Sequence, residues 1–209
     1  MKREATIDRR THETTIHLEL SLETPSNDNS DAGAPGAVAS PGICTGIGFF
    51  DHMLASFAKH AYMSLVVEAK GDLHVDGHHT VEDTGIALGQ ALRHALGDKA
   101  GIRRFGHAYV PLDEALSLAV VDVSGRPFLV FEADFDGECT GGLETQLVEE
   151  FFRAVTVNAG ITVHLQCLYG SNDHHRIESM FKAFARALRE AVEPDPAAAG
   201  GVPSTKGVL

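Results

Sequence analysis

Hydrophobic and polar residues alternate along this chain with two periods, one typical of half-buried strands and the other of amphipathic helices. In residues 15–22 every second side chain is aliphatic, which predicts a strand with one buried face. In residues 48–61 the apolar side chains recur at steps of three and four, and predict a helix whose polar face carries His52 and His60. Residues 23–42, between these elements, are rich in Pro, Gly, Ser and Asp and predict a loop.

The same periods predict the remaining elements. Residues 63–77 favour a strand, a Gly-Asp turn and a short edge strand, and residues 80–97 favour a helix that stops at Gly97. Residues 114–135 predict two strands around a Ser-Gly-Arg-Pro turn, and residues 161–170 predict another strand. Helices are expected at 143–160 and 174–192, and a flexible tail at 200–209.

The order of these elements indicates an internal repeat. Residues 49–97 read helix, strand, turn, His-His-x-x-Glu and helix, and residues 143–192 read the same way. Aligning His78 with His174 also places Glu82 on Glu178. Such self-similarity predicts two similar α+β halves, each with a small, mainly antiparallel sheet backed by helices on one face.

The repeated His-His-x-x-Glu motif predicts a metal site. Adjacent histidines at a helix entrance diverge, so one loop can offer imidazoles to two centres, with the glutamate one turn further along. Imidazole with carboxylate suits Mn, Fe, Co, Ni or Zn, and no cysteine lies near either motif to indicate structural zinc. The alternative is a solvated helix start with a favourable first-turn acid. Two copies at equivalent places favour metal binding.

Other residues extend this prediction. His52 precedes His78 by 26 residues, and the repeat puts Glu149 or Glu150 in a similar place before His174. Either position could supply a further ligand, although a surface glutamate pair on a helix is common. Arg104, Arg126 and Lys206 follow turn signals and could form a pocket for an anion, or each could be an ordinary surface charge.

Composition narrows the function classes. The 209 residues carry 17 basic and 29 acidic side chains, a formal net charge of −12, which argues against a general nucleic-acid or anionic-membrane surface. A few local cations could still hold one phosphate. Three cysteines without CxxC spacing favour a reducing cytoplasm over a disulfide scaffold. We expect no membrane helix, because no run approaches about 18 apolar residues.

Eight motifs spread over nearly the whole chain carry a family resemblance. They are RRTHETTIHLEL, GFFDHML, GDLHVDGHHTVEDTGIALGQAL, GIRRFGHAYVPLDEAL, DVSGRPF, TQLVEEFF, HHRIESMFKAFARAL and PSTKGVL. Taken jointly they resemble the imidazoleglycerol-phosphate dehydratase family of histidine biosynthesis. The resemblance implies an α+β fold of two βαβα-type half-domains like the second domain of ribosomal protein S5. We expect one domain over residues 1–209, with pseudo-repeats at about 7–97 and 98–193, a flexible loop near 25–42 and a tail at 194–209.

The resemblance also implies a reaction, a cofactor and an assembly. Such an enzyme removes water from D-erythro-imidazole-glycerol phosphate and gives imidazole-acetol phosphate. Two Mn(II) ions per active site would hold the substrate ring as an imidazolate, which expels the C3 hydroxyl through a diazafulvene-like intermediate. The metal would also assemble the chains into a 24-mer whose sites lie between neighbouring subunits.

Carried onto this sequence, the resemblance implies three sets of site residues. The metal ligands would be His52, His78, His79, Glu82, Glu150, His174, His175 and Glu178. Proton transfer would fall to Glu13 and Glu178. The substrate would be bound by Glu13, His52, His60, His78, His79, Arg104, Arg126, His174, Ser204 and Lys206, of which Arg104, Arg126, Ser204 and Lys206 would hold the phosphate.

The chain departs from the family pattern at a few places. Glu150 stands where many relatives carry histidine, Ala55-Ser56 replaces a glutamine that often follows DHML, and the loop near 25–42 is longer than usual. Two other functions compete with the dehydratase prediction: a dinuclear metallohydrolase and a non-catalytic metal-storage protein. An Asp-rich dinuclear motif is missing for the first, and the anion-binding arginines would have no role in the second.

Overall fold

The computed structural model describes residues 2–23, 42–198 and 200–207, and these residues form two separate four-stranded sheets with four α-helices. The first half contains β1 (Glu4–Arg10), β2 (Thr14–Ser21), β3 (Ile43–Cys44), α1 (Gly48–Ala61), β4 (Ser64–Gly71) and α2 (His78–Leu96). The second half contains β5 (Phe105–Leu112), β6 (Ala115–Asp122), β7 (Phe128–Glu132), β8 (Cys139–Thr140), β9 (Leu143–Glu144), α3 (Gln146–Ala159), β10 (Thr162–Tyr169), α4 (Asp173–Val192) and a short 3-10 helix (Pro196–Ala198). An α+β fold is therefore confirmed.

The two large sheets have the same strand order. The first runs β1-β2-β4-β3 and the second β5-β6-β10-β7. In each sheet the first three strands pair antiparallel, and the last pair, β4 with β3 or β10 with β7, is parallel. Both halves thus arrange the strands around one helical crossover in the same way.

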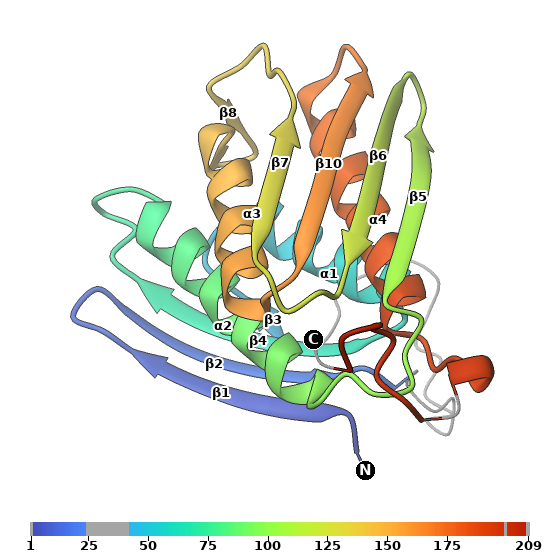
Figure 1. The fold of residues 1–209 in the computed structure, drawn as a ribbon. Helices are drawn as coiled ribbons and strands as arrows, with labels where there is room; N and C mark the ends of the chain where they lie inside the picture. The colour runs from blue at the N-terminus through green and yellow to red at the C-terminus, as the bar shows by residue number, and fades with distance from the viewer. Residues whose placement is uncertain (1, 24–41, 199, 208–209) are drawn as a thin grey trace, which may run out of the picture.

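The four helices lie between the two sheets (Figure 1). Helix α2 packs on β1 and β2, α4 packs on β5 and β6, and the halves meet where α2 contacts α3 and α1 contacts α4. Each sheet is therefore backed by helices on one face. The centre is an aromatic cluster of Phe50, Phe151, Phe152, Phe181 and Phe184, each at most 1% exposed. Burying a side chain of this size contributes about 1.5–3 kcal/mol.

Some elements differ from those that the sequence pattern predicts. The pattern missed β1 and β5 because both are edge strands, with only a few apolar residues facing the helices. The short strand expected after Gly71 is a turn, and the helix expected from 143 begins only at Gln146, after β8 and β9. Of the predicted loop near 25–42, residues 25–41 lie outside the described residues.

Close helix packing explains the glycines inside α2. A Cβ atom on Gly89 would meet the backbone oxygen of Val155 at 2.6 Å and the backbone nitrogen of Ala159 at 3.0 Å, both in α3. Glycine costs about 1 kcal/mol in a helix relative to alanine, so it is retained here because it lets the two backbones approach. This contact holds α2, and with it the first His-His-x-x-Glu motif, against the second half.

Candidate metal and anion sites

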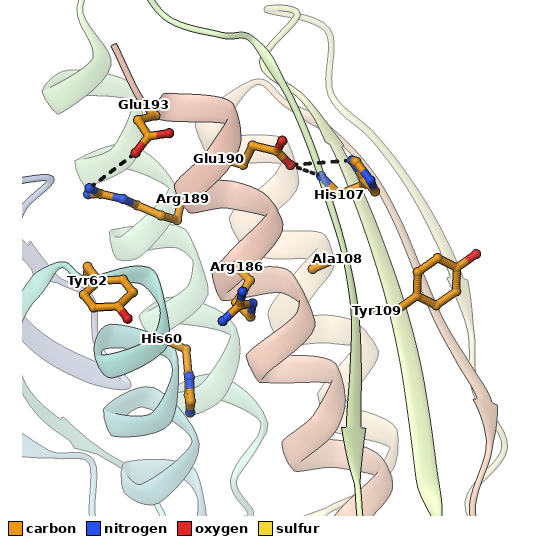
Figure 2. Close-up of a pocket in the computed structure, with 9 residues that line it drawn as sticks. All are labelled: His60, Tyr62, His107, Ala108, Tyr109, Arg186, Arg189, Glu190 and Glu193. Atoms are coloured by element: carbon orange, nitrogen blue, oxygen red, sulfur yellow. Dashed lines mark hydrogen bonds and ion pairs between the residues drawn. The ribbon is translucent and has the colours of Figure 1, made fainter. Parts of the chain in front are cut away.

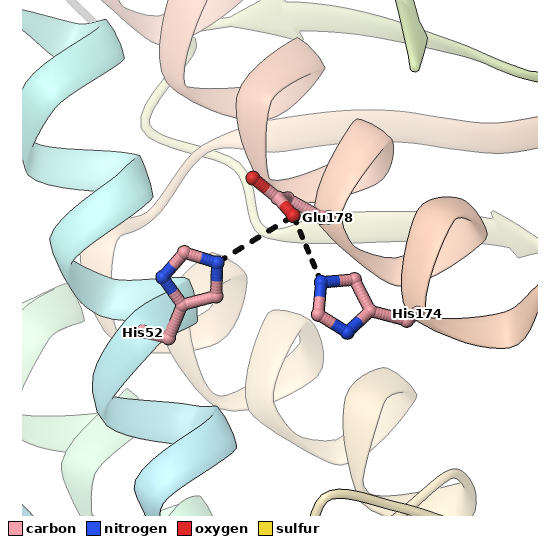
Figure 3. Close-up of side chains that lie close together, drawn as sticks. All are labelled: His52, His174 and Glu178. Carbon is pink, nitrogen blue, oxygen red and sulfur yellow. Dashed lines mark hydrogen bonds and ion pairs between the residues drawn. The ribbon is translucent and has the colours of Figure 1, made fainter. Parts of the chain in front are cut away.

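Three predicted metal ligands come together between helices α1 and α4. His52 of α1 and His174 and Glu178 of α4 each offer a ligand atom, and these atoms lie within 4.8 Å of one another. The Oε2 atom of Glu178 lies 3.5 Å from His52 Nε2 and 3.1 Å from His174 Nε2 (Figure 3). We call this group the α1–α4 cluster. Two imidazoles and one carboxylate form a donor set that fits a first-row divalent ion.

The carboxylate of Glu178 is charged and strongly held. Its other oxygen, Oε1, forms an ion pair with Nζ of Lys182 at 2.8 Å, and Lys182 lies one turn further along α4. Burial is the largest influence on the pKa of Glu178 and raises it, but Lys182 and the two imidazoles together lower the pKa below its usual value. An ionised carboxylate at this position is suited to bind a cation or to accept a proton.

A second group, the α2 cluster, surrounds the start of helix α2. It consists of Glu13, Asp72, His78, His79 and Glu82. His79 Nε2 lies 3.8 Å from Glu13, while both oxygens of Asp72 lie 3.0–3.1 Å from its Nδ1. The hydrogen bond with Asp72 raises the pKa of His79. His78 lies 3.7 Å from Glu82, one helical turn away.

The hairpin that carries Glu13 is fastened to α2 by a buried carboxylate. Asp83 accepts a hydrogen bond from Thr14 Oγ1 at 2.5 Å and pairs with Arg9 Nη2 at 2.7 Å. Since Thr14 follows Glu13 directly, the turn between β1 and β2 is held beside the helix start. The contacts of Asp83 therefore orient the turn that carries Glu13, and they keep the Glu13 side chain beside His79.

The adjacent histidines diverge in both motifs, as the sequence predicts. The rings of His78 and His79 lie 6.1 Å apart at 84°, and those of His174 and His175 lie 6.0 Å apart at 86°. In the second motif Asn172 caps α4 by accepting from the backbone N–H groups of His174 and His175. His174 then faces His52, whereas His175 turns toward the β5–β6 hairpin.

Glu114 of that hairpin holds His175. Its Oε2 lies 2.7 Å from His175 Nδ1, and this hydrogen bond is the largest of the influences that lower the pKa of Glu114 to about 2. The same bond raises the pKa of His175. The neighbouring Asp113 lies 3.9 Å from the other ring nitrogen, Nε2.

The predicted anion-binding residues also come together. Arg104, Arg126, Ser204 and Lys206 line one cavity of about 520 Å³ with Pro203 and Thr205, and we call it the basic pocket. Asp122 holds the guanidinium of Arg104 with two bonds, at 2.8 and 3.2 Å, and Arg104 Nη1 donates to Pro203 O at 2.8 Å. The segment 203–206 is therefore anchored beside Arg104, and Arg126 remains 68% exposed.

Two predicted site residues lie elsewhere. Glu150 pairs with Arg153 of its own helix at 3.5 Å and is not part of the α1–α4 cluster. His60, two turns beyond His52 on α1, lines a different cavity of about 540 Å³ with Tyr62, Arg186 and Arg189 (Figure 2). Burial, and then the charges of Lys182 and Arg186, lower the pKa of His60.

Sequence reasoning missed the carboxylates and the lysine that hold the predicted residues. Asp72 follows Gly71 in the predicted turn, and Glu114 lies in a hairpin whose first strand was not predicted. Lys182 stands four residues after Glu178, so helical spacing alone could have indicated that pair. The other two contacts depend on how turns fold back onto a helix start, which periodicity does not report.

The fold and these sites place the chain among α+β proteins that combine histidine–carboxylate clusters with a separate basic pocket. Among the described helices, none has both the length and the apolar character that crossing a membrane requires. A family model for imidazoleglycerol-phosphate dehydratase matches residues 45–188. The imidazoleglycerol-phosphate dehydratase of Acidiphilium cryptum is 56% identical over 209 residues, 100% of both chains. That of Streptococcus mutans is 55% identical over 207 residues, covering 99% of this chain and 100% of the relative.

Solved structures of imidazoleglycerol-phosphate dehydratases are also similar to this chain. Imidazoleglycerol-phosphate dehydratase from Staphylococcus aureus superposes with a TM-score of 0.76 at 40% identity, over 91% of this chain and 99% of that chain. The enzyme from Pyrococcus furiosus gives 0.77 at 34% identity, over 97% and 100%. The chain therefore belongs to the imidazoleglycerol-phosphate dehydratase family. It is a hydro-lyase of histidine biosynthesis.

Proposed function

We propose that this chain catalyses the metal-dependent dehydration of D-erythro-imidazole-glycerol phosphate to imidazole-acetol phosphate, with two Mn(II) ions in each active site. The observation that carries the metal dependence is the α1–α4 cluster, in which one ligand atom from the first half and two from the second lie within 4.8 Å of one another. Membership in the family supplies the substrate and the product.

Bound Mn(II) would act as a Lewis acid on the imidazole ring of the substrate and so assist the departure of the C3 hydroxyl. We assign its ligands to His52, His78, His79, Glu82, Glu150, His174, His175 and Glu178. Ligation by Glu150 requires its carboxylate to leave Arg153. That pair is half-exposed, and such pairs are worth only about 0–1 kcal/mol, so the rearrangement is inexpensive.

The two proton transfers belong to Glu13 and Glu178. Dehydration needs one group to take the proton beside the imidazole ring and one to protonate the departing hydroxyl. The low pKa of Glu178 keeps a carboxylate beside His52 and His174, and Glu13 lies beside His79 at a hairpin turn. Each acid thus belongs to one of the two clusters, which suits transfers on either side of one substrate.

The phosphate of the substrate binds in the basic pocket. Three cationic side chains and the hydroxyl of Ser204 surround the cavity, and the fork of Arg104 is already oriented by Asp122. The planar guanidinium groups match phosphate oxygens, and charge-assisted bonds of this kind are the strong ones. Glu13, His52, His60, His78, His79 and His174 would bind the rest of the substrate.

The α2 cluster lies at the start of α2 and the α1–α4 cluster lies between α1 and α4, and we assign both to active sites shared between subunits. In the proposed 24-mer, the α2 cluster of one chain would face the α1–α4 cluster of a neighbour. Metal bridging then couples assembly to occupancy of the site. The proposal also covers a single domain of two pseudo-repeats at about 7–97 and 98–193, and a cytoplasmic location, which the three free cysteines support.

Metal analysis combined with particle mass and turnover tests the proposal. Purified protein should contain two Mn(II) per active site, convert the substrate to an enolisable ketone, and dissociate to small oligomers with a chelator. His79→Ala should lower the metal content and abolish turnover. Full turnover by protein stripped of metal would contradict the proposal. Cleavage of a generic phosphate ester without dehydration would instead support a metallohydrolase, and bound metal without either activity would support storage.

A further inference from the structure

The carboxylate of Glu114 makes bonds in two directions. Its Oε1 accepts from the backbone N–H of Ser171 at 3.0 Å, from the backbone N–H of Asn172 at 2.9 Å, and from the Ser171 hydroxyl at 3.3 Å. Its Oε2 faces His175 Nδ1 at 2.7 Å. One side chain of the β5–β6 turn therefore connects the loop before α4 with an imidazole in the first turn of this helix.

The second bond determines which nitrogen of His175 carries its proton. A carboxylate can only accept, so Nδ1 must be the donor in this pair. A neutral imidazole with its proton on Nδ1 keeps the lone pair on Nε2, and only a lone pair can bind a metal ion. Carboxylates that accept from the far nitrogen of a ligand histidine commonly fix its tautomer and raise its basicity.

We propose that Glu114 is a positioning residue that holds His175 with its proton on Nδ1 and thereby makes Nε2 the metal-binding atom. The inference rests on the proposed function, in which His175 is a ligand. It adds that the donor groups of residues 171 and 172 fix the direction of the Glu114 carboxylate. Glu114 thus holds the loop before α4 in place and also determines which ring nitrogen of His175 carries the proton.

The α2 cluster contains a similar pair with one difference. Asp72 accepts from His79 Nδ1, and both of its oxygens lie 3.0–3.1 Å from that nitrogen. In the part of the chain that the structure describes, the backbone N–H of Asp72 itself donates to this carboxylate and no backbone N–H of another residue does, so fewer hydrogen bonds fix its orientation than fix that of Glu114. An amide at position 72 could therefore turn its oxygen toward Nδ1, whereas an amide at position 114 could not.

Glu114→Gln provides the sharpest test. The amide oxygen would be kept by the N–H groups of residues 171 and 172, so the amide NH2 would face His175 Nδ1 and require it to accept. The proton would move to Nε2 and block metal binding there. We expect the Kd for Mn(II), measured by equilibrium dialysis with the full-length protein, to rise about 10- to 100-fold, the range found when such partners are removed.

Glu114→Ala distinguishes positioning from simple structural support. Alanine leaves His175 free to adopt either tautomer, so Mn(II) binding should weaken less than in Glu114→Gln. The two N–H groups lose their acceptor only in the alanine variant, so its melting temperature without metal should fall further. We therefore expect opposite orders for the two variants in metal affinity and in thermal stability. The same order in both measurements would overturn the inference.

Two further variants complete the experiment. Asp72→Asn should raise the Kd for Mn(II) less than Glu114→Gln, because its amide can rotate; an equal or larger effect would contradict the role of the fixed carboxylate. His175→Ala should lose Mn(II) binding to at least the extent of Glu114→Gln. If His175→Ala binds normally, the ligand assignment itself fails, and the inference with it. If His175→Ala loses metal while Glu114→Gln binds normally, only the inference fails.

Discussion

At the scale of single residues, histidine and the two permanently cationic side chains, arginine and lysine, occur in different sites. Histidines gather with carboxylates in the two clusters, whereas arginine and lysine line the basic pocket. Imidazole can be neutral near pH 7 and so offer a lone pair, while a guanidinium stays charged and can only donate. Loss of an arginine in the basic pocket should therefore weaken substrate binding without changing the metal content.

Arg126→Ala tests this separation. Its exposed side chain lines the basic pocket, and one hydrogen bond between a cation and phosphate contributes about 1.5–3 kcal/mol. We expect KM to rise roughly 10- to 100-fold with little change in metal content. Steady-state kinetics and metal analysis would measure both. Arg103→Ala is the matched control, because Arg103 pairs with Glu193 outside the pocket. A complete loss of metal in Arg126→Ala would contradict the phosphate role.

The sequence predicted the candidate metal ligands better than it predicted the residues that hydrogen-bond to those ligands. Spacing indicated His78, His174 and their glutamates, because a repeated motif at helix starts has few structural explanations. It did not indicate Asp72 or Glu114, because their roles arise only when a turn folds back onto a histidine. The sequence also could not predict that His52 lies beside His174, because this contact depends on how α1 packs on α4 and no local sequence pattern indicates that packing.

At the scale of elements, the approach of α2 to α3 depends on glycine. Gly89→Ala would gain about 1 kcal/mol of helix propensity, but its Cβ would press on the backbone of α3. Overpacking of this kind costs about 1–3 kcal/mol, and the backbone cannot yield like a flexible side chain. We expect a lower midpoint in denaturant unfolding. Gly48→Ala, at the start of α1, has open space around its Cβ and should be neutral or slightly stabilising.

The outer face of the first sheet carries a pH-dependent contact. His17 lies 2.7 Å from Asp8 on β1 and 3.2 Å from Glu19 on its own strand, and these bonds raise the pKa of His17 above 6.5. A raised pKa stabilises the fold below the unfolded value, and the gain is lost as the pH rises through the folded value. His17→Gln should therefore lower the melting temperature at pH 5.5 and not at pH 9. An equal change at both pH values would contradict the ion pair.

At the scale of the whole molecule, the two sheets present different outer faces. On the first sheet the outward residues are mainly charged or hydroxylic, including Glu4, Asp8 and Glu19. On the second, large apolar side chains are exposed: Phe105, Tyr109, Val120, Phe128 and Leu168. Apolar patches of this kind are typical of protein contacts, and the proposed 24-mer would supply a second copy of the chain as the partner.

Val120→Lys tests whether this face joins subunits. Val120 lies at the centre of the second sheet, paired with His107 on β5 and His164 on β10. An ammonium group buried there without a partner would cost several kcal/mol, so the metal-loaded protein should sediment as smaller particles. Val66→Lys makes the same change on the outer face of the first sheet, beside Glu19, and should leave the particle mass unchanged. Normal assembly of Val120→Lys with unchanged circular dichroism would show that chains join through another surface, because lysine on an open sheet face is tolerated.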